Sequence, residues 1–335
     1  MKRKFRFIRG VFYILILLSL LIVGCGGDSG ANDNAEAVGL HRDSRLNVGG
    51  INRIFDYYIP DNLGTQPIPL VFLLHGGGSS PDDLTGVSGY KAPYKVWMDI
   101  ADSEKIILVY PQGTKNPAGG FGWNDCRGDA TTNPTVDDVA FIEALINYFS
   151  NRFYLDENRI YATGTSNGGH MSLRLAIELS DKIAAVAPVV AAMPAVNNCT
   201  VSAQAISILM MNGSDDPILP YLGGEVAPDI GGRGTVLSSQ ASVDYWNAFN
   251  ETDVVPTIEN YLDVNLFDNS SVSRVTYANG REGSQVVLYE VNGGGHVEPS
   301  IQEQYSEVIE LYLGMQNHDM EMATEIWAFF KNQTL

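Results

Sequence analysis

The chain has 335 residues, of which 45% are apolar, so it can bury the core of one large α/β domain or of two smaller domains. Its formal net charge is −18, and the first nine residues carry five Lys or Arg, so loss of this head segment leaves about −23. Such an acidic surface repels phosphate backbones, which argues against a nucleic-acid partner. Acidity of this kind is typical of a protein that must stay soluble or that works in a salty habitat.

The first 24 residues are typical of a secretory signal peptide. A basic start is followed by an apolar run, residues 11–23, which is short for a membrane span. The run ends in Ile22-Val23-Gly24-Cys25, which resembles a bacterial lipobox and predicts lipidation of Cys25. The alternative is a plain signal peptide with an incidental cysteine. Residues 25–43 are small, polar and acidic, and we expect a flexible tether there.

Residues 44–335 are predicted to form one catalytic domain in which strands alternate with helices. Strands are expected at 52–60, 68–76, 106–113, 159–164, 183–190, 205–213 and 284–291, and helices at 92–105, 136–153, 167–180, 236–249 and 320–332. This alternation is typical of a mostly parallel sheet with helices on both faces. Ligands bind at the carboxyl ends of strands in such sheets, so the chemistry should be sought where these strands end.

The segment Gly164-Thr165-Ser166-Asn167-Gly168 matches the G-x-S-x-G pattern of a nucleophile elbow and falls between a predicted strand and a predicted helix. A serine in a sharp turn has room only where the residues two before and two after it are small. The helix that follows directs its positive end at Ser166, where an oxyanion could form. The alternative is a glycine-rich turn that serves only packing.

A serine nucleophile needs a base, and the chain has five histidines. His41 in the tether and His318 in a polar loop are expected to be solvated. His170, on the first turn of the helix after the serine, is expected to pack or to face solvent. His75 opens "HGGGSS" and is expected to hold that loop, whereas His296 follows the last predicted strand and is our candidate base.

The orienting carboxylate is expected in "NGSDDP", where Asp215 and Asp216 follow a strand. Either carboxylate could instead serve a turn or a helix cap. The chain order of serine, aspartate and histidine is that of α/β-hydrolases. The "HGGGSS" loop resembles the oxyanion loop of that fold, and we expect the backbone N–H groups of Gly77 and Asn167 to hold an oxyanion.

Two cysteines remain in the exported part, Cys126 and Cys199. An isolated pair in an oxidising compartment predicts a disulfide, and two buried thiols are the alternative. Neither cysteine has the neighbouring cysteines or histidines of a zinc site, so we expect no metal.

Together the motifs "LLHGGGSS", "VYPQGT", "GWNDC", "IYATGTSNGGHMSLRLA", "NGSDDPILPY", "GRGTVLSSQASVDYW" and "GGGH" resemble the extracellular polyhydroxybutyrate depolymerase and feruloyl esterase family of α/β-hydrolases, which is similar to carbohydrate esterase family 1. The resemblance runs from about residue 48 to the end of the chain. It implies that Ser166 is the nucleophile, Asp216 rather than Asp215 the carboxylate, and His296 the base. It also places Trp123 near the acyl pocket, although core packing is an equal alternative for that side chain.

The chain departs from the family at two positions. Gly77 stands where the family often has cysteine, although a backbone N–H remains. Glu298 in "GGGHVEPS" replaces the tryptophan of "GGGHTWPG", so an aromatic wall for a polyester or an aryl ring is expected to be missing. Both departures concern the substrate more than the reaction.

These observations predict an exported serine carboxylesterase, held at the membrane only by a lipid anchor, with no metal or organic cofactor. The expected substrates are feruloyl or acetyl esters of plant polysaccharide, or a short-chain polyhydroxyalkanoate. One alternative is a peptidase of the prolyl oligopeptidase type, although the chain has no room for its propeller domain. The other is a surface lipoprotein that binds glycan or polymer without catalysis. The oligomeric state is left open.

Overall fold

A computed structural model describes residues 36–89, 93–117, 119–200 and 204–335. The predicted signal peptide and Cys25 lie outside these described residues. Residues 37–335 form one compact unit. Among the described residues, no helix combines the length and the apolar character that a membrane crossing requires.

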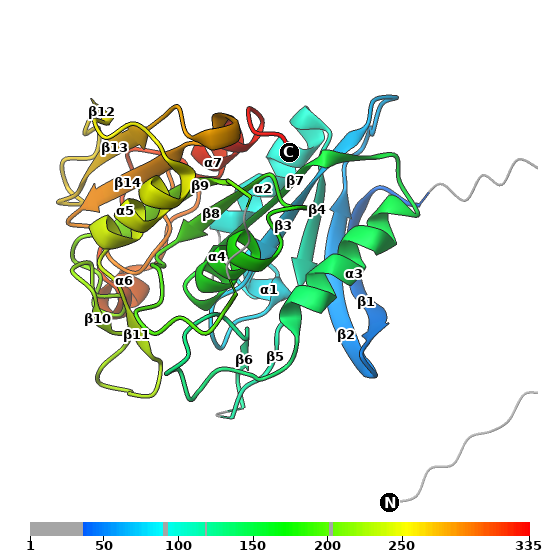
Figure 1. Cartoon of the computed structure of the whole chain (residues 1–335), viewed down its shortest axis with the longest axis horizontal. Helices are drawn as coiled ribbons and strands as arrows, with labels where there is room; N and C mark the ends of the chain where they lie inside the picture. Colours follow the sequence, from blue (N-terminus) through cyan, green and yellow to red (C-terminus); the bar gives the residue numbers. More distant parts are fainter. Residues whose placement is uncertain (1–35, 90–92, 118, 201–203) are drawn as a thin grey trace, which may run out of the picture. The chain divides into compact units, whose positions relative to one another are not determined.

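A 10-stranded sheet with the order β1-β2-β4-β3-β7-β8-β9-β14-β13-β12 runs through this unit (Figure 1). Its strands are β1 Gly39–Val48, β2 Ile51–Ile59, β3 Ile68–Leu74, β4 Ile107–Pro111, β7 Leu155–Thr165, β8 Ala185–Val189, β9 Ser207–Gly213, β12 Thr257–Asn260, β13 Ser271–Tyr277 and β14 Val286–Asn292. The pairs from β4 through β14 are parallel, and the strands at both edges are antiparallel. The predicted mostly parallel α/β fold is confirmed.

Helices cover both faces of the sheet (Figure 1). They are α1 Pro81–Leu84, α2 Val96–Glu104, α3 Asp138–Ser150, α4 Asn167–Glu178, α5 Ser239–Asn250, α6 Glu307–Leu313 and α7 Met322–Phe330, with short 3-10 turns at Pro93–Lys95 and Arg281–Gly283. Helices α3, α4 and α5 bury their apolar side chains in the core on one face of the sheet. Helices α2 and α7 do so in a second core on the other face.

The apolar pattern of the chain accounts for these layers. All seven residues of β3, "IPLVFLL", are buried, as expected for a strand covered on both faces. Helix α3 begins at the N-cap Asp137, whose carboxylate accepts the N–H of Ala140, and it buries an apolar stripe that includes Phe141 and Leu145. These apolar segments form the buried core, and the loops that connect them lie at the edges of the sheet.

The first strand begins earlier than the sequence indicates. Strand β1 starts at Gly39, inside the segment 25–43 that we expected to be a tether, and His41 pairs with Tyr57 across β1 and β2. The His41 ring stacks on the Tyr57 ring with 4.4 Å between centroids, so His41 is partly covered by β2 rather than fully solvated as expected. Cross-strand pairing orders this polar stretch, which has little apolar pattern of its own.

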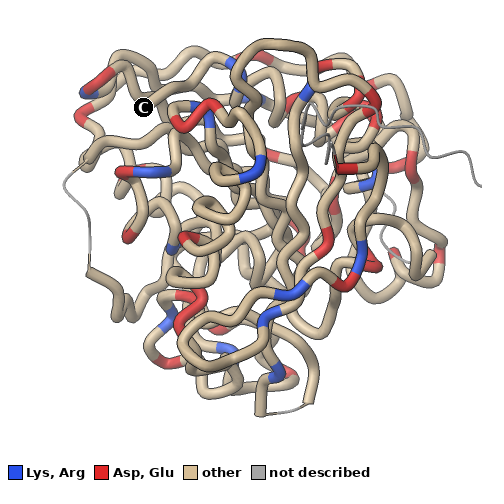
Figure 2. Tube along the Cα trace, turned by 90° about the vertical axis from the view of Figure 1, so that its right-hand side faces the viewer, with Lys and Arg blue, Asp and Glu red and all other residues tan. Residues whose placement is uncertain are grey.

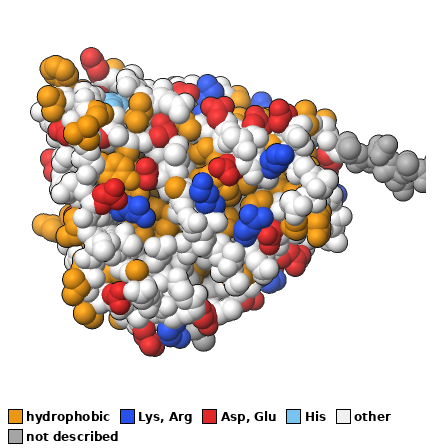
Figure 3. Space-filling model, turned by 90° about the horizontal axis from the view of Figure 1, so that it is seen from above, with side chains coloured by type: hydrophobic (Ala, Val, Ile, Leu, Met, Phe, Trp, Pro, Cys, Tyr) orange, Lys and Arg blue, Asp and Glu red, His pale blue; other side chains and the backbone are white. Residues whose placement is uncertain are grey.

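Short hairpins and α6 gather at the carboxyl edge of the parallel strands, along the lower side of Figure 1. The hairpins are β5 Thr114–Lys115 with β6 Phe121–Gly122, and β10 Gly224–Glu225 with β11 Thr235–Val236. Acidic and basic residues are spread over the trace (Figure 2), and on the upper face charges of both signs alternate with apolar side chains (Figure 3).

Candidate active site

Ser166 lies in a sharp turn between β7 and α4. Its backbone has φ 54° and ψ −118°, a conformation that costs a residue with a side chain and is often found at functional sites. The flanking glycines are required by sterics. A Cβ on Gly164 would lie 2.6 Å from the carbonyl carbon of Gly168, and a Cβ on Gly168 would lie 2.1 Å from the carbonyl oxygen of Leu74. The serine is therefore held in a strained, partly exposed turn.

His296 and Asp216 are brought together from the ends of β14 and β9. The Nδ1 of His296 lies 2.7 Å from Oδ2 of Asp216. The other oxygen of Asp216 accepts the backbone N–H groups of Ile218 and Leu219, both at 2.7 Å. Asp215, in contrast, is exposed and accepts the hydroxyl of Ser214. It is thus Asp216 that orients the imidazole, with Nδ1 as donor and Nε2 free to accept a proton.

The loop that carries His296 is tied to its surroundings through the main chain. The N–H of Gly295 donates to the carbonyl of Met315 at 2.8 Å, and the N–H of His296 donates to that of Leu313, at the end of α6. The neighbouring turn after β9 packs so closely that a Cβ on Gly213 would lie 2.2 Å from the carbonyl oxygen of Gly294. Both sides of the His296–Asp216 pair are therefore held by backbone contacts.

His170 is buried on the first turn of α4, where its Nδ1 donates to the carbonyl of Ala192 at 3.0 Å. Burial, with the nearby charge of Arg127, lowers the pKa of His170 to about 3, and His296 adds a smaller lowering effect. His170 is therefore neutral and used in packing.

The candidate oxyanion donors lie next to each other. The position of a Cβ on Gly77 is 3.6 Å from the Cβ of Asn167, so the exposed Gly77 backbone faces the start of α4. Asn167 is the first residue of α4, and an N–H at that position has no intrahelical acceptor. His75 holds the loop from behind, because its Nε2 accepts the N–H of Gly113 at 2.9 Å.

Trp123 does not reach the surface. Its side chain is fully buried, and its indole N–H donates to the carbonyl of His75 at 2.8 Å. Its backbone N–H donates to the side-chain oxygen of Asn167 at 2.7 Å. The expectation of a substrate-contacting tryptophan is therefore wrong for this structure. The aromatic ring packs behind the oxyanion loop and supports it.

A buried ion pair also holds Asn167, and our sequence reasoning missed it. Asp125 accepts the side-chain N–H of Asn167 at 2.7 Å and pairs with Arg127 at 2.6 Å. Burial tends to raise the pKa of Asp125, but Arg127 outweighs it, so the net shift is downward. The only sequence signal was the "NDCRGD" cluster around Cys126.

Cys126 and Cys199 form a disulfide with their Cα atoms 5.3 Å apart, which confirms the predicted bond. Cys126 lies between the two members of the ion pair in sequence, and the bond joins its loop to the segment that follows β8. The N–H of Asn198 also donates to the carbonyl of Cys126, and that of Gly128 donates to the carbonyl of Val196. The disulfide and these two backbone hydrogen bonds therefore fix the loop around Cys126 to the loop around Cys199.

Glu298, two residues after His296, is buried and accepts the hydroxyl of Tyr305 at 2.5 Å. Burial and the charge of Glu298 raise the pKa of Tyr305 well above its ordinary value. The side chain of Gln316 donates to the carbonyl of Glu298 at 2.8 Å. Glu298 therefore points into the protein. It does not provide the wall that the family's tryptophan would form at this position.

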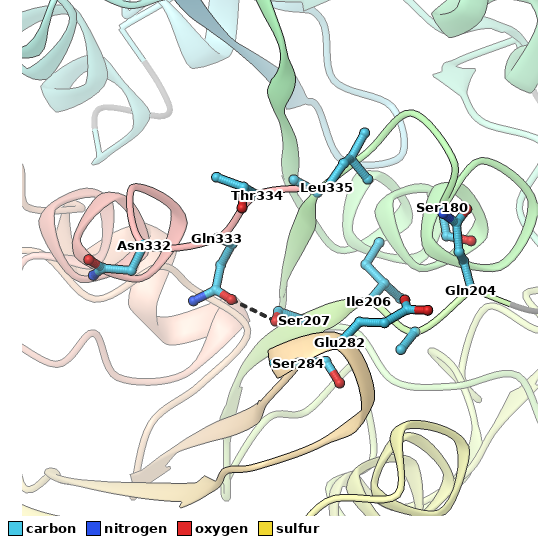
Figure 4. A pocket seen from close by; sticks show the side chains of 13 residues that line it. Ser180, Gln204, Ile206, Ser207, Glu282, Ser284, Asn332, Gln333, Thr334 and Leu335 are labelled. Carbon is cyan, nitrogen blue, oxygen red and sulfur yellow. Dashed lines mark hydrogen bonds between the residues drawn. The ribbon is translucent and has the colours of Figure 1, made fainter.

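Within the described residues, no group of three or more His, Cys, Asp or Glu could hold a metal ion. A cavity of about 340 Å³ lies at the opposite edge of the sheet, where β9 begins (Figure 4). Its lining includes Ser180, Ser207 and Gln333, and the hydroxyl of Ser207 donates to Gln333 at 2.7 Å. That cavity is separated from Ser166 by the length of the strands and contains none of the candidate residues.

The fold and the arrangement at the carboxyl edge of the sheet are those of an α/β-hydrolase. The chain belongs to the phospholipase and carboxylesterase family, whose sequence profile matches residues 63–230, about half of the chain. The predicted esterase family is thereby confirmed.

The proteins to which this chain is similar include two curated relatives and one solved structure. NocK of Nocardia uniformis subsp. tsuyamanensis, named as a candidate esterase, is 30% identical over 69% of this chain and 65% of its own length. Feruloyl esterase D of Neurospora crassa is 25% identical over 68% of this chain and 82% of its own length. The crystal structure of a thermostable esterase matches 87% of this chain and 62% of its own chain, with a TM-score of 0.51 and 17% identity, and it supports the fold alone.

Proposed function

We propose that the protein is a serine carboxylesterase in which Ser166 is the nucleophile, His296 the base and Asp216 the orienting carboxylate. The observation that carries the proposal is the 2.7 Å hydrogen bond between His296 and Asp216, in a chain whose Ser166 occupies a strained strand-to-helix turn. An imidazole that donates Nδ1–H to a carboxylate has Nε2 available as a base.

The reaction follows from this arrangement. The Oγ of Ser166 attacks the ester carbonyl carbon while Nε2 of His296 takes its proton. The imidazolium then returns this proton to the leaving alkoxide as the C–O bond breaks, which releases the alcohol and leaves an acyl-enzyme. Water, deprotonated by His296, attacks the acyl group and releases the carboxylic acid, and the proton returns to Ser166.

The tetrahedral intermediates carry a negative charge on the former carbonyl oxygen. We assign the backbone N–H groups of Gly77 and Asn167 to this oxyanion, supported by the contact between the two residues and by the position of Asn167 at the start of α4. Trp123 and Asp125 hold Asn167 from behind and act as positioning residues.

The substrate is proposed to be a feruloyl or acetyl ester of plant polysaccharide, or a short-chain polyhydroxyalkanoate. The similarity to a protein named feruloyl esterase D supports the first of these classes. Glu298, at the position of the family's tryptophan, is buried and offers no aromatic ring to the acyl group.

We also propose that the protein is exported and anchored through lipidated Cys25. The Cys126–Cys199 disulfide supports export, because such bonds persist in oxidising compartments. Metabolic labelling with a palmitate analogue tests the anchor: the full-length chain should be labelled and Cys25→Ala should not.

The catalytic proposal is tested by treating the domain with a fluorophosphonate probe and mapping the adduct by mass spectrometry. The wild type should label at Ser166 and hydrolyse 4-nitrophenyl acetate. Ser166→Ala should do neither, whereas the control Ser172→Ala, on the same helix, should do both. Absence of an adduct at Ser166 in active protein would refute the assignment, and absence of any activity would favour a non-catalytic binding protein.

A substrate panel then separates the remaining candidates. Methyl ferulate, acetylated xylan and polyhydroxybutyrate represent the proposed ester classes, and a Gly-Pro anilide represents the peptidase alternative. We expect hydrolysis of at least one ester and no release from the anilide. The opposite pattern would replace the esterase proposal with a peptidase.

A further inference from the structure

An arginine lies beside the candidate oxyanion loop. Arg233 belongs to the segment between β10 and β11, and its Nη1 is 3.4 Å from the position that a Cβ on Gly77 would take. The same position is 3.6 Å from the Cβ of Asn167. The guanidinium and the two candidate oxyanion donors therefore border one space, although they come from three separate parts of the chain.

Among the described residues, nothing pairs with the charge of this guanidinium. The Nε of Arg233 is buried and has no hydrogen-bond partner among the described residues, and no carboxylate of that part of the chain forms an ion pair with this side chain. The buried Arg53 and Arg127, in contrast, each pair with an aspartate at 2.6 Å. Arg233 as a residue is only partly buried, so its guanidinium is accessible to an acceptor supplied from outside the chain.

The backbone around Arg233 is held in place. Its carbonyl accepts Nη1 of Arg127 at 2.7 Å, and the carbonyl of Gly232 accepts the hydroxyl of Thr132 at 3.1 Å. The hydroxyl of Thr235 donates to Asp129 at 2.7 Å. Through these contacts the segment is fastened to the loop that contains the disulfide. The backbone of Arg233 is therefore held in a fixed position beside the oxyanion loop.

We propose that Arg233 is a specificity-determining residue that binds a carboxylate which the substrate carries a few bonds from its scissile ester. This inference rests on the proposed esterase function. An oxygen held by the Gly77 N–H lies about 3 Å from that nitrogen, so the guanidinium is within reach of a substituent close to the ester. Its planar fork matches a carboxylate in a bidentate manner.

The negative net charge of the chain is a further reason to expect a local positive group that binds a carboxylate. The sequence contains 39 acidic and 21 basic residues, so its field repels anionic substrates. An unpaired guanidinium beside the ester-binding donors offsets part of this repulsion at that point. The carboxylate could belong to the alcohol side, as in a uronate-containing glycan, or to the acyl side, as in a half-ester of a dicarboxylic acid.

The test compares kcat/KM for substrates that carry a carboxylate with kcat/KM for neutral partners in which a methyl group takes its place. On the alcohol side, 3-acetoxybenzoate is paired with 3-acetoxytoluene. On the acyl side, monoethyl succinate is paired with ethyl butyrate, and acid release is followed by pH-stat. Arg233→Met keeps the side-chain length without the charge, Arg233→Lys keeps the charge without the fork, and Arg152→Met, at an exposed position at the end of α3, controls for net charge.

We expect Arg233→Met to lower kcat/KM about 10- to 100-fold for the charged member of at least one pair, mainly through KM. The neutral members should change less than about threefold, and Arg233→Lys should fall in between because it retains the charge but not the fork. The pair that responds identifies the side of the ester. Equal losses for charged and neutral members, or no loss for either, would overturn the proposal.

Failure of the esterase proposal is distinguishable from failure of this one. In the Ser166→Ala background, 3-acetoxybenzoate binding is measured by calorimetry with and without Arg233→Met. Binding that depends on Arg233 supports carboxylate recognition even if turnover is never observed. Binding that is unchanged by the loss of the guanidinium refutes it, while the 4-nitrophenyl acetate assay reports on the nucleophile independently.

Discussion

The ion pair between Asp125 and Arg127 should stabilise both the domain and the candidate oxyanion hole. Both side chains are buried, and Asp125 also accepts the side-chain N–H groups of Asn133 at 2.8 Å and Asn167 at 2.7 Å. Asp125→Ala removes all of these acceptors at once and leaves the Arg127 guanidinium buried without its carboxylate. Loss of one partner of a buried pair typically costs about 3–5 kcal/mol in the free energy of unfolding.

Activity should fall as well, for a separate reason. Without Asp125, the side chain of Asn167 keeps only its contacts with Trp123, so the first turn of α4 is less firmly placed. Loss of a complete oxyanion donor costs about 100- to 1000-fold in kcat, and a displaced donor should cost less, about 10- to 100-fold. Guanidinium chloride unfolding and kcat/KM for 4-nitrophenyl acetate measure the two effects.

Two further variants separate charge from position. The control Glu143→Gln breaks a partly exposed surface ion pair with Lys182 and should cost less than about 1 kcal/mol. The double variant Asp125→Leu with Arg127→Met removes both charges and should recover most of the lost stability but not the lost activity. If Asp125→Ala unfolds within 1 kcal/mol of the wild type, as expected for the exposed control, our reading of Arg127 as a desolvated charge is refuted.

Three other perturbations have distinct expected results. Asp216→Asn should lower kcat about 10³- to 10⁴-fold because the imidazole loses its orienting acceptor, while Asp215→Asn should change it less than about threefold. Removal of the disulfide by replacing Cys126 and Cys199 with serine should cost about 2–5 kcal/mol in the free energy of unfolding. Burial and the charge of Arg127 lower the pKa of His170 to about 3 from its ordinary value of 6.5, so on acidification the unfolded chain binds the proton first. Stability should therefore be complete above pH 6.5 and should fall by up to about 1.4 kcal/mol per pH unit on acidification, a slope that His170→Gln should lack.

Each of these expectations has a contradicting outcome. Equal losses in the two aspartate variants would mean that the His296 contact does not orient the base. An unchanged denaturation midpoint in the double serine variant would show that the disulfide closes a loop that is already ordered when the chain is unfolded. A pH slope that persists in His170→Gln would assign the acid sensitivity to other groups.

Much of the architecture follows from the sequence because its signals are local. The uninterrupted apolar run of β3 and the apolar stripe of α3 each specify an element without reference to distant residues. The glycines around Ser166 mark the sharp turn for the same reason. Strand β1 was not predicted, because its order comes from pairing with β2 rather than from its own polar residues.

The details of the site were decided only by tertiary structure. Asp215 and Asp216 are neighbours of the same type, and only the turn after β9 directs one carboxylate to His296 and the other to solvent. The sequence around Trp123 does not indicate whether its side chain lines a pocket or packs in the core. The proposed role of Arg233 depends on its position beside Gly77, which is distant from it in sequence.

The sequence by itself thus determined the class of fold, the strained serine and the order of the candidate catalytic residues, because those features depend on neighbours along the chain. The packing of distant loops decided which side chains meet at the carboxyl edge of the sheet and which are turned inward. That selection depends on burial, on ion pairing and on close backbone contacts, such as those around Asp125 and Gly77, which link residues far apart in the sequence.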